Sequence, residues 1–269
     1  MSAADPAGSV TEQIDALFLR QAIKLAEAGM FSVTANPRVG CIIVRDGAVL
    51  GRGAHLRAGD AHAEALAIDD AGGDVRGATV YVSLEPCAIV GRTPACASTL
   101  IEMGVARVVC PAEDPHPQVA GRGFAMLVEA GVEVVQRAMP AARRLNYAHE
   151  RLMRRGWPYV RIKVAQSLDG RTAMADGTSK WITSADARAD VQYWRARSGA
   201  IITGIGTLLA DDPVLCGFRG PKLQIKRLFI SRFNAAVLCQ VIGVVDDCRE
   251  KFGWGGWFVA NVKMTDFIG

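Results

Sequence analysis

Strand patterns alternate with helix patterns over residues 39–135, and this alternation limits the possible folds more than any other feature of the chain. Apolar runs such as ATVYVSL and VARVVCPA are typical of buried strands, and a helix pattern follows each of them. The run VGCIIVRDGAVLGRG predicts a β-hairpin that turns at Asp46-Gly47. A further helix is predicted over residues 11–29, before the first strand. Together these patterns predict a three-layer α/β domain.

A second unit is predicted to begin after a boundary near residues 150–156. Residues 141–155 form a predicted connecting helix, and a new strand-rich pattern starts at Trp157. We therefore expect one domain over residues 11–150 and another over residues 156–269. Residues 216–269 contain six of the nine phenylalanines and three of the seven cysteines, and their apolar periodicity is weak. This shift predicts a divergent tail.

The cysteine content and the charge limit the class of protein. Seven cysteines is an odd number without the spacing of a small disulfide scaffold, so thiols in a reducing compartment are expected. The beginning of the chain has no apolar run and residues 198–210 are too few to span a bilayer, which predicts a cytoplasmic protein without a membrane partner. The net charge of +4 does not by itself imply nucleic acid. The basic run 143–163 is interpreted as a solvated helix face and a linker, with a phosphate or nucleic-acid patch as the alternative.

Four residues in the motifs HAE and SLEPCAIVGRTPAC are candidates for metal chemistry: His62, Glu64, Cys87 and Cys96. One histidine and two cysteines supply the three ligands of a catalytic zinc, whose fourth tetrahedral position is left for water. A water bound in this way ionises near neutral pH. Glu64, near the start of the same predicted helix as His62, is predicted to carry protons from that water to a leaving amine. Cys96 opens a predicted helix, and a helix N-terminus favours a thiolate.

The combination of motifs is more informative than any one residue. A single histidine is usually satisfied by a hydrogen bond and a single buried cysteine behaves as a small apolar residue, as we expect for Cys41 and Cys110 inside strands. Zinc deaminases carry H-x-E followed by P-C-x-x-C, but here eight residues separate the two cysteines, so the loop between them must bulge. Two alternatives stay open: a deaminase acting on another base, nucleoside or RNA, and a non-catalytic zinc module with a fourth protein ligand.

Several segments taken together resemble the RibD family of riboflavin biosynthesis proteins, which combine a pyrimidine deaminase with a reductase. The matching segments are NPRVGCIIVRDG, GAHLRAGDAHAEALA, GATVYVSLEPC with GRTPAC, VARVVCPAEDPHPQVAGRG, PYVRIKVAQSLDGRTA, SKWITSADAR and GIGTLLADDPVL. They run from about residue 11 to residue 215, and the cysteine spacing separates this family from nucleoside and tRNA deaminases. The resemblance implies a cytidine-deaminase-like domain followed by a partial dihydrofolate-reductase-like α/β domain.

The resemblance also implies two reactions, with Zn²⁺ and NADPH as the cofactors. The first domain would deaminate 2,5-diamino-6-(ribosylamino)pyrimidinone 5′-phosphate, and the second would reduce the ribosyl group of the product to ribityl. The implied partner is thus a small phosphorylated pyrimidine, with no nucleic acid, and the implied assembly is a homo-oligomer.

Site residues follow from the resemblance residue by residue. His62, Cys87 and Cys96 are the implied zinc ligands, and Glu64 is the implied proton carrier. The implied substrate contacts in the first site are Asn36, His55 and Arg92, of which Arg92 suits a phosphate. In the second site, the implied NADP contacts are Ala165, Trp181, Thr207 and Asp211, and the implied substrate contacts are Ser179, Arg195 and Leu215.

The chain departs from the family pattern in two places. Ala88, Ile89 and Val90 stand where the family often has a histidine, so apolar atoms replace a polar substrate contact. After Leu215 the resemblance stops, because Phe218 replaces an arginine and we find no late glycine-rich loop for the NADP phosphates. An incomplete sheet exposes an unpaired edge. We therefore expect a truncated end and an impaired reductase.

Overall fold

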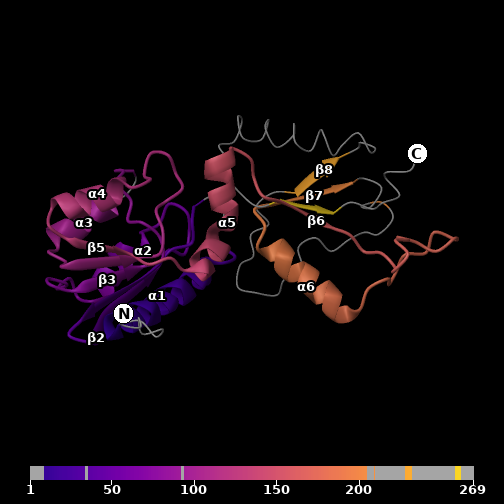
Figure 1. Cartoon of the computed structure of the whole chain (residues 1–269). Helices are drawn as coiled ribbons and strands as arrows, with labels where there is room; N and C mark the ends of the chain where they lie inside the picture. The colour runs from indigo at the N-terminus through magenta and orange to yellow at the C-terminus, as the bar shows by residue number, and fades with distance from the viewer. Residues whose placement is uncertain are drawn as a thin grey trace, which may run out of the picture. The chain divides into compact units, whose positions relative to one another are not determined.

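The structure is a computed structural model that describes residues 9–33, 36–91, 94–204 and 209, together with the backbone of two short strands at 228–231 and 258–261. The chain forms two compact units, which divide between Arg155 and Gly156. Figure 1 shows the first unit in indigo and magenta and the second in orange and yellow.

The first unit is built on a five-stranded sheet with the order β2-β1-β3-β4-β5. β1 is antiparallel to β2 and β3, whereas β3, β4 and β5 are parallel to one another. The strands are β1 Gly40–Arg45, β2 Ala48–Ala54, β3 Thr79–Val82, β4 Arg107–Cys110 and β5 Glu133–Gln136. The predicted hairpin is confirmed, because Asp46 and Gly47 have φ angles of 53° and 76° between β1 and β2. Positive φ at both central residues is what a two-residue hairpin turn of this hand requires.

Helices cover both faces of this sheet, which confirms the predicted three-layer α/β fold. The helices of the unit are α1 Val10–Ala26, η1 Glu27–Gly29, α2 Ala63–Asp70, α3 Cys96–Glu102, α4 Arg122–Glu129 and α5 Pro140–Arg155. Side chains of α2, α3 and α4 pack with Cys41, Ile43 and other residues on one face. Side chains of α1 pack with Ile42 and Val44 on the opposite face. Successive strand residues alternate between two apolar layers because their side chains point to opposite faces of the sheet.

The predicted connecting helix is α5, which packs on α1 through Ala142 and Leu145. Most of the basic run lies on this helix. Arg143 and Arg154 both pair there with Glu150, at 2.9 and 3.1 Å. These contacts agree with the interpretation of this part of the run as a charged helix face.

A buried ion pair joins α1 to the face of the first sheet that this helix covers. Asp15 on α1 accepts two hydrogen bonds from the Arg107 guanidinium, at 2.7 and 2.8 Å, and a third from the Tyr81 hydroxyl at 3.0 Å. The Asp15 side chain is only 3% exposed, and Arg107 also pairs with Glu133, whose side chain is 63% exposed. Because the carboxylate is buried and fully paired, its loss would leave polar groups of Arg107 and Tyr81 unsatisfied.

We expect Asp15→Asn to lower the free energy of unfolding by about 3 kcal/mol, because removal of one partner of a buried pair exposes the cost of burying the other. Glu133→Gln removes the exposed partner of the same arginine and should cost less than about 1 kcal/mol. Urea unfolding at pH 7 measures both changes. Equal losses in the two variants would show that the Asp15 pair contributes no more than a surface contact.

The contribution of Asp15 should also depend on pH. Burial by itself raises the pKa of Asp15, but hydrogen bonds from Arg107 and Tyr81 outweigh it, and the pKa is lowered from its ordinary value of 3.8. A carboxyl whose pKa is lowered by folding stabilises the fold fully above its unfolded pKa, and this stability is lost as the pH falls through the folded pKa. The difference in unfolding free energy between the wild type and Asp15→Asn should therefore narrow below about pH 4.

The second unit contains a parallel four-stranded sheet with the order β6-β9-β7-β8. Its elements are β6 Val160–Lys163, α6 Ala185–Ala196, β7 Ala200–Gly204, β8 Leu228–Ser231 and β9 Phe258–Asn261. The strand-rich pattern predicted from Trp157 onward is thus confirmed. The divergent tail contributes β8 and β9, and β9 lies between β6 and β7. Neither strand was predicted from the sequence, because short apolar runs without periodicity do not distinguish strand from helix.

Within the described part of the chain, no helix combines the length and the apolar character needed to cross a membrane.

Candidate metal centre

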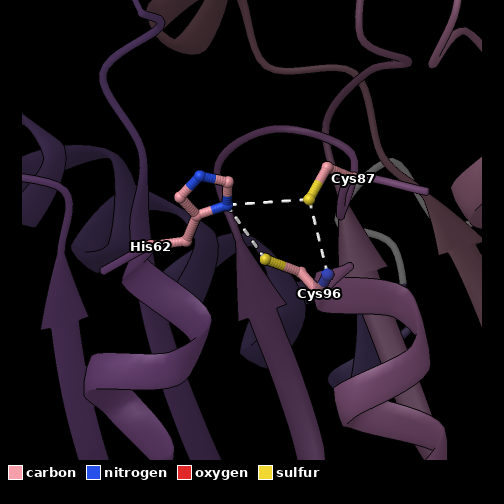
Figure 2. Close-up of side chains that lie close together, drawn as sticks. All are labelled: His62, Cys87 and Cys96. Carbon is pink, nitrogen blue, oxygen red and sulfur yellow. Dashed lines mark hydrogen bonds between the residues drawn. The ribbon is translucent and has the colours of Figure 1, made fainter. Parts of the chain in front are cut away.

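Three elements of the first unit bring the predicted zinc ligands together. His62 is the N-cap residue of α2, Cys96 is the first residue of α3, and Cys87 lies in the loop after β3. His62 Nδ1 lies 3.1 Å from Cys96 Sγ and 3.6 Å from Cys87 Sγ. Figure 2 shows the imidazole and the two thiols facing one another. Cys87 and Cys96 follow His62 by 25 and 34 positions in the sequence, and the fold brings all three side chains together.

The donor set and its spacing fit a tetrahedral zinc ion. The three ligand atoms all lie within 4.8 Å of one another. Zinc bonds of about 2.0 Å to nitrogen and about 2.3 Å to sulfur place tetrahedral N and S ligands about 3.6 Å apart. Of the two N–S distances in the structure, the one to Cys87, 3.6 Å, equals that value, and the one to Cys96, 3.1 Å, is shorter. Three protein ligands of type N and S, with a fourth position free for water, are the arrangement of a catalytic rather than a structural zinc.

Hydrogen bonds within the cluster favour the ligand form of Cys87. The Cys96 thiol and, after it, His62 lower the pKa of Cys87 to about 4, although burial opposes them. The backbone N–H of Cys96 also donates to Cys87 Sγ at 3.4 Å. The hydrogen bond between His62 and Cys87 raises the pKa of His62. A thiolate is the form of cysteine that binds metals, so Cys87 is prepared for the role of a ligand.

Glu64 lies one residue into α2 and is only 4% exposed. Burial raises its pKa to about 7. A hydrogen bond with its own backbone N–H lowers the pKa, but by less than burial raises it. A carboxyl group with a pKa near the working pH both accepts and releases protons readily. The candidate ligands act on this pKa in opposite directions, since Cys87 raises it and His62 lowers it. Its burial beside the cluster is the arrangement expected of a proton carrier.

Asn36 and His55, which the resemblance implied as substrate contacts, adjoin the cluster. The Asn36 amide nitrogen lies 3.3 Å from His55 Nε2, and His55 Nδ1 lies 3.1 Å from the carbonyl oxygen of Ala61. An amide nitrogen only donates and a carbonyl only accepts, so His55 carries its proton on Nδ1. Its ring meets the His62 ring edge-on, with 5.5 Å between centroids. Burial lowers the pKa of His55, which favours a neutral ring next to His62.

The loop between the two cysteines contains the predicted departure from the family. Arg92, predicted as a phosphate contact, lies outside the described residues. Within the described part of this loop, Val90 is 76% exposed and Ile89 is 37% exposed. Two apolar side chains thus lie near the surface a few residues after Cys87.

The residues predicted for the second site lie on separate segments of the second unit. Ala165 follows the end of β6, Ser179 and Trp181 lie in the loop before α6, and Arg195 lies on α6. Trp181 is 70% exposed, and the Arg188 guanidinium stacks over its ring at 4.3 Å from the ring centre. Burial lowers the pKa of Arg195. Thr207, Asp211 and Leu215 lie outside the described residues.

The ends of β6 and β7 nevertheless lie at one edge of the second sheet. Lys163 of β6 and Thr203 of β7 both pair with Asn261 of β9. In open parallel sheets, ligands bind outside the carboxyl ends of the strands. Ala165, two residues beyond β6, is therefore at an edge suited to a ligand.

Two buried polar residues of the first unit were not singled out from the sequence. Arg38 exchanges two 2.8 Å hydrogen bonds with Asn146, which is 108 positions away on α5. Glu85, two residues before Cys87, is only 3% exposed and accepts hydrogen bonds from four backbone N–H groups. A charged residue directly after an apolar strand was the signal in the sequence that could have identified Glu85. Such a residue is rarely buried without partners.

Two family models match this chain. Residues 12–112 match the model described as the cytidine and deoxycytidylate deaminase zinc-binding region. Residues 158–238 match the RibD C-terminal domain, so the likeness extends past Leu215.

Curated relatives and solved structures agree with these matches. The chain is 50% identical to the riboflavin biosynthesis protein RibD of Haemophilus influenzae over 75% of its own length and 54% of that protein. It is 52% identical to the Escherichia coli RibD over 75% of its length and 55% of that protein. It thus spans about half the length of these relatives. The Acinetobacter baumannii RibD structure is 38% identical with a TM-score of 0.82, covering 93% of this chain and 81% of that one.

Proposed function

Because the chain belongs to the RibD family of riboflavin biosynthesis proteins, we propose that its first unit hydrolytically deaminates 2,5-diamino-6-(ribosylamino)pyrimidinone 5′-phosphate. The observation that carries this proposal is the convergence of His62, Cys87 and Cys96 beside a buried glutamate, Glu64. A solved relative from Thermotoga maritima, 29% identical with a TM-score of 0.80, is described as a diaminohydroxyphosphoribosylaminopyrimidine deaminase and reductase. The cofactors of such a chain are Zn²⁺ in the first unit and NADPH in the second.

In the proposed reaction, His62 Nδ1 and the sulfurs of Cys87 and Cys96 would hold the zinc ion. The bound ion supplies a nucleophile at neutral pH by lowering the pKa of water. Glu64 accepts the proton that this water releases and delivers it to the amino group that leaves as ammonia. The raised pKa of Glu64, about 7, suits both transfers. His55, neutral and fixed by Asn36 and Ala61, presents a defined pattern of donor and acceptor beside the cluster.

We assign Asn36, His55 and Arg92 to substrate binding in this unit. A guanidinium forms paired, charge-assisted hydrogen bonds with phosphate oxygens, so Arg92 suits the 5′-phosphate. The apolar side chains of Ile89 and Val90 in the same loop cannot donate to the substrate, so substrate affinity should depend strongly on the remaining polar contacts.

For the second unit we propose reduction of the deaminated product by NADPH. Its proposed cofactor contacts are Ala165, Trp181, Thr207 and Asp211, and its proposed substrate contacts are Ser179, Arg195 and Leu215. The match to the RibD C-terminal domain supports this assignment. The test is NADPH oxidation by the purified chain with the deaminated product. Oxidation that requires this product would support the assignment, and its complete absence would contradict it for this chain.

The deaminase proposal is tested by ammonia release from three substrates: the ribosylaminopyrimidine phosphate, cytidine and an RNA. We expect release from the first substrate only. Release from cytidine or RNA at a comparable rate would favour a deaminase of another specificity. No release from any of the three by a zinc-loaded chain would favour a non-catalytic zinc module.

We further propose that the chain acts in the cytoplasm as a homo-oligomer. Cys41, Cys87, Cys96 and Cys110 are unbridged, as expected in a reducing compartment. Light scattering of the purified chain measures its assembly, and a monomer at all concentrations would contradict the second part of this proposal.

A further inference from the structure

Glu85 lies in an irregular segment between the end of β3 and the metal ligand Cys87. β3 ends at Val82, so no strand pairing fixes the backbone of Glu85 and Pro86. On its other side, Cys87 is fixed by α3, because its carbonyl oxygen accepts a hydrogen bond from Ala97 N–H at 3.1 Å. Cys87 Sγ also accepts a hydrogen bond from the Cys96 N–H at 3.4 Å. From the other direction, the position of Cys87 depends on what fixes the two residues before it.

The Glu85 carboxylate supplies that fixed point. Oε1 accepts hydrogen bonds from the N–H groups of Gly123 and Phe124 at 2.8 and 3.3 Å. Oε2 accepts from the N–H groups of Asp114 and Gly121 at 2.9 and 3.0 Å. The N-cap residue of α4, Gly121, has no side chain to cap the helix, so Glu85 satisfies N–H groups that the first turn leaves free.

The first turn of α4 also contacts the backbone between Glu85 and Cys87 directly. A Cβ atom on Gly123 would lie only 1.9 Å from the carbonyl oxygen of Pro86. Only glycine permits this approach, because any other residue would displace the Pro86 carbonyl. Proline itself has a fixed φ angle, so the position of Cys87 follows closely from that of Pro86.

We propose that Glu85 is a positioning residue for the metal centre: it ties the Pro86-Cys87 segment to the start of α4 and so sets the direction of Cys87 Sγ. This inference rests on the proposed role of Cys87 as a zinc ligand. Groups that orient metal ligands without touching the metal typically contribute about 10- to 100-fold to metal affinity. A role for Glu85 in stability alone would leave the geometry of the bound metal unchanged.

Glu85→Gln is the informative substitution because it keeps the size of the side chain and removes its charge. Each carboxylate oxygen faces two N–H donors, so in either orientation the glutamine amide would turn an NH₂ group toward two other donors. The segment must then shift. Gly123→Ala reaches the same segment from the other side, by pushing the Pro86 carbonyl away.

The experiment uses Co²⁺ in place of zinc in the purified full chain. Its visible absorption reports ligand geometry, and competition with a chelator reports affinity. We expect both variants to bind Co²⁺ about 10- to 100-fold more weakly than the wild type, with shifted absorption bands. Asp15→Asn is the control, because it removes a buried carboxylate on the α1 side of the sheet; it should lower stability and leave the Co²⁺ spectrum unchanged.

The outcomes separate this inference from the proposed function. If the wild type binds Co²⁺ through thiolates and both variants show its spectrum and affinity, Glu85 has no positioning role. If the wild type shows no thiolate-to-cobalt absorption, the proposed metal centre fails and the inference fails with it. Circular dichroism of each variant establishes that weaker binding occurs in a folded chain, and Gly123→Ala decides the matter if Glu85→Gln does not fold.

Discussion

Glu64→Ala should retain its zinc and lose ammonia release by roughly 10²- to 10⁴-fold, the usual contribution of a positioned proton carrier. Glu64 is buried next to the ligand cluster, and burial raises its pKa to about 7. Alanine removes this carboxyl group but none of the three ligand atoms. The measurement is zinc content per chain together with the rate of ammonia release from the pyrimidine substrate.

Glu64→Gln is the matched comparison for this prediction. It keeps the shape and hydrogen-bonding capacity of the side chain but cannot take up or release a proton near neutral pH. If proton transfer is the role of Glu64, both variants lose activity to a similar extent. Near-normal turnover in the glutamine variant would remove the proton carrier from the mechanism, and loss of zinc from both variants would make Glu64 a part of the metal site.

Cys87→Ser should lose zinc, deamination and a large part of the stability of the first unit. A serine hydroxyl keeps its proton near neutral pH, whereas the pKa of Cys87 is lowered to about 4 by Cys96 and His62. A ligand present at about 1,000 times its dissociation constant stabilises the fold by about 4 kcal/mol, so weaker binding lowers the free energy of unfolding. Thermal unfolding with and without added zinc measures this linkage.

Cys110→Ser is the control for that variant. Cys110 is fully buried in β4, and its thiol donates a hydrogen bond to the carbonyl oxygen of Ala112 at 3.3 Å. A serine can keep this hydrogen bond, and Cys110 lies outside the ligand cluster. We expect zinc content to be unchanged in Cys110→Ser. Equal zinc loss in the two variants would indicate a general effect of cysteine replacement rather than loss of a ligand.

Local patterns in the sequence predicted most of the first unit. Asp46-Gly47 has the chemistry of a tight turn, and the structure has a hairpin there. His62, Cys87 and Cys96 could be proposed as ligands from the sequence because zinc chemistry restricts both residue type and spacing, and the structure brings their nitrogen and sulfur atoms together. The placement of His62 was less accurate, since it precedes α2 as its N-cap residue rather than lying within the helix. Helix ends are the least certain part of any such prediction.

Contacts between distant segments could not be predicted in this way. Asp15 and Arg107 are 92 positions apart, and nothing local to either residue identifies the other as its partner. Glu85 reads as an ordinary charged residue until the fold brings the start of α4 to it. The strand β9 could not be predicted for the same reason. Its place between β6 and β7 depends on pairing with both neighbours rather than on its own four residues.

The central claim is that one imidazole nitrogen and two thiolate sulfurs bind a zinc ion whose fourth position is open. X-ray absorption at the zinc edge on the purified chain tests it most directly. The account predicts two sulfur ligands at about 2.3 Å, one nitrogen at about 2.0 Å and a light fourth ligand supplied by solvent. A spectrum with four protein ligands, or with no sulfur in the coordination sphere, would contradict it.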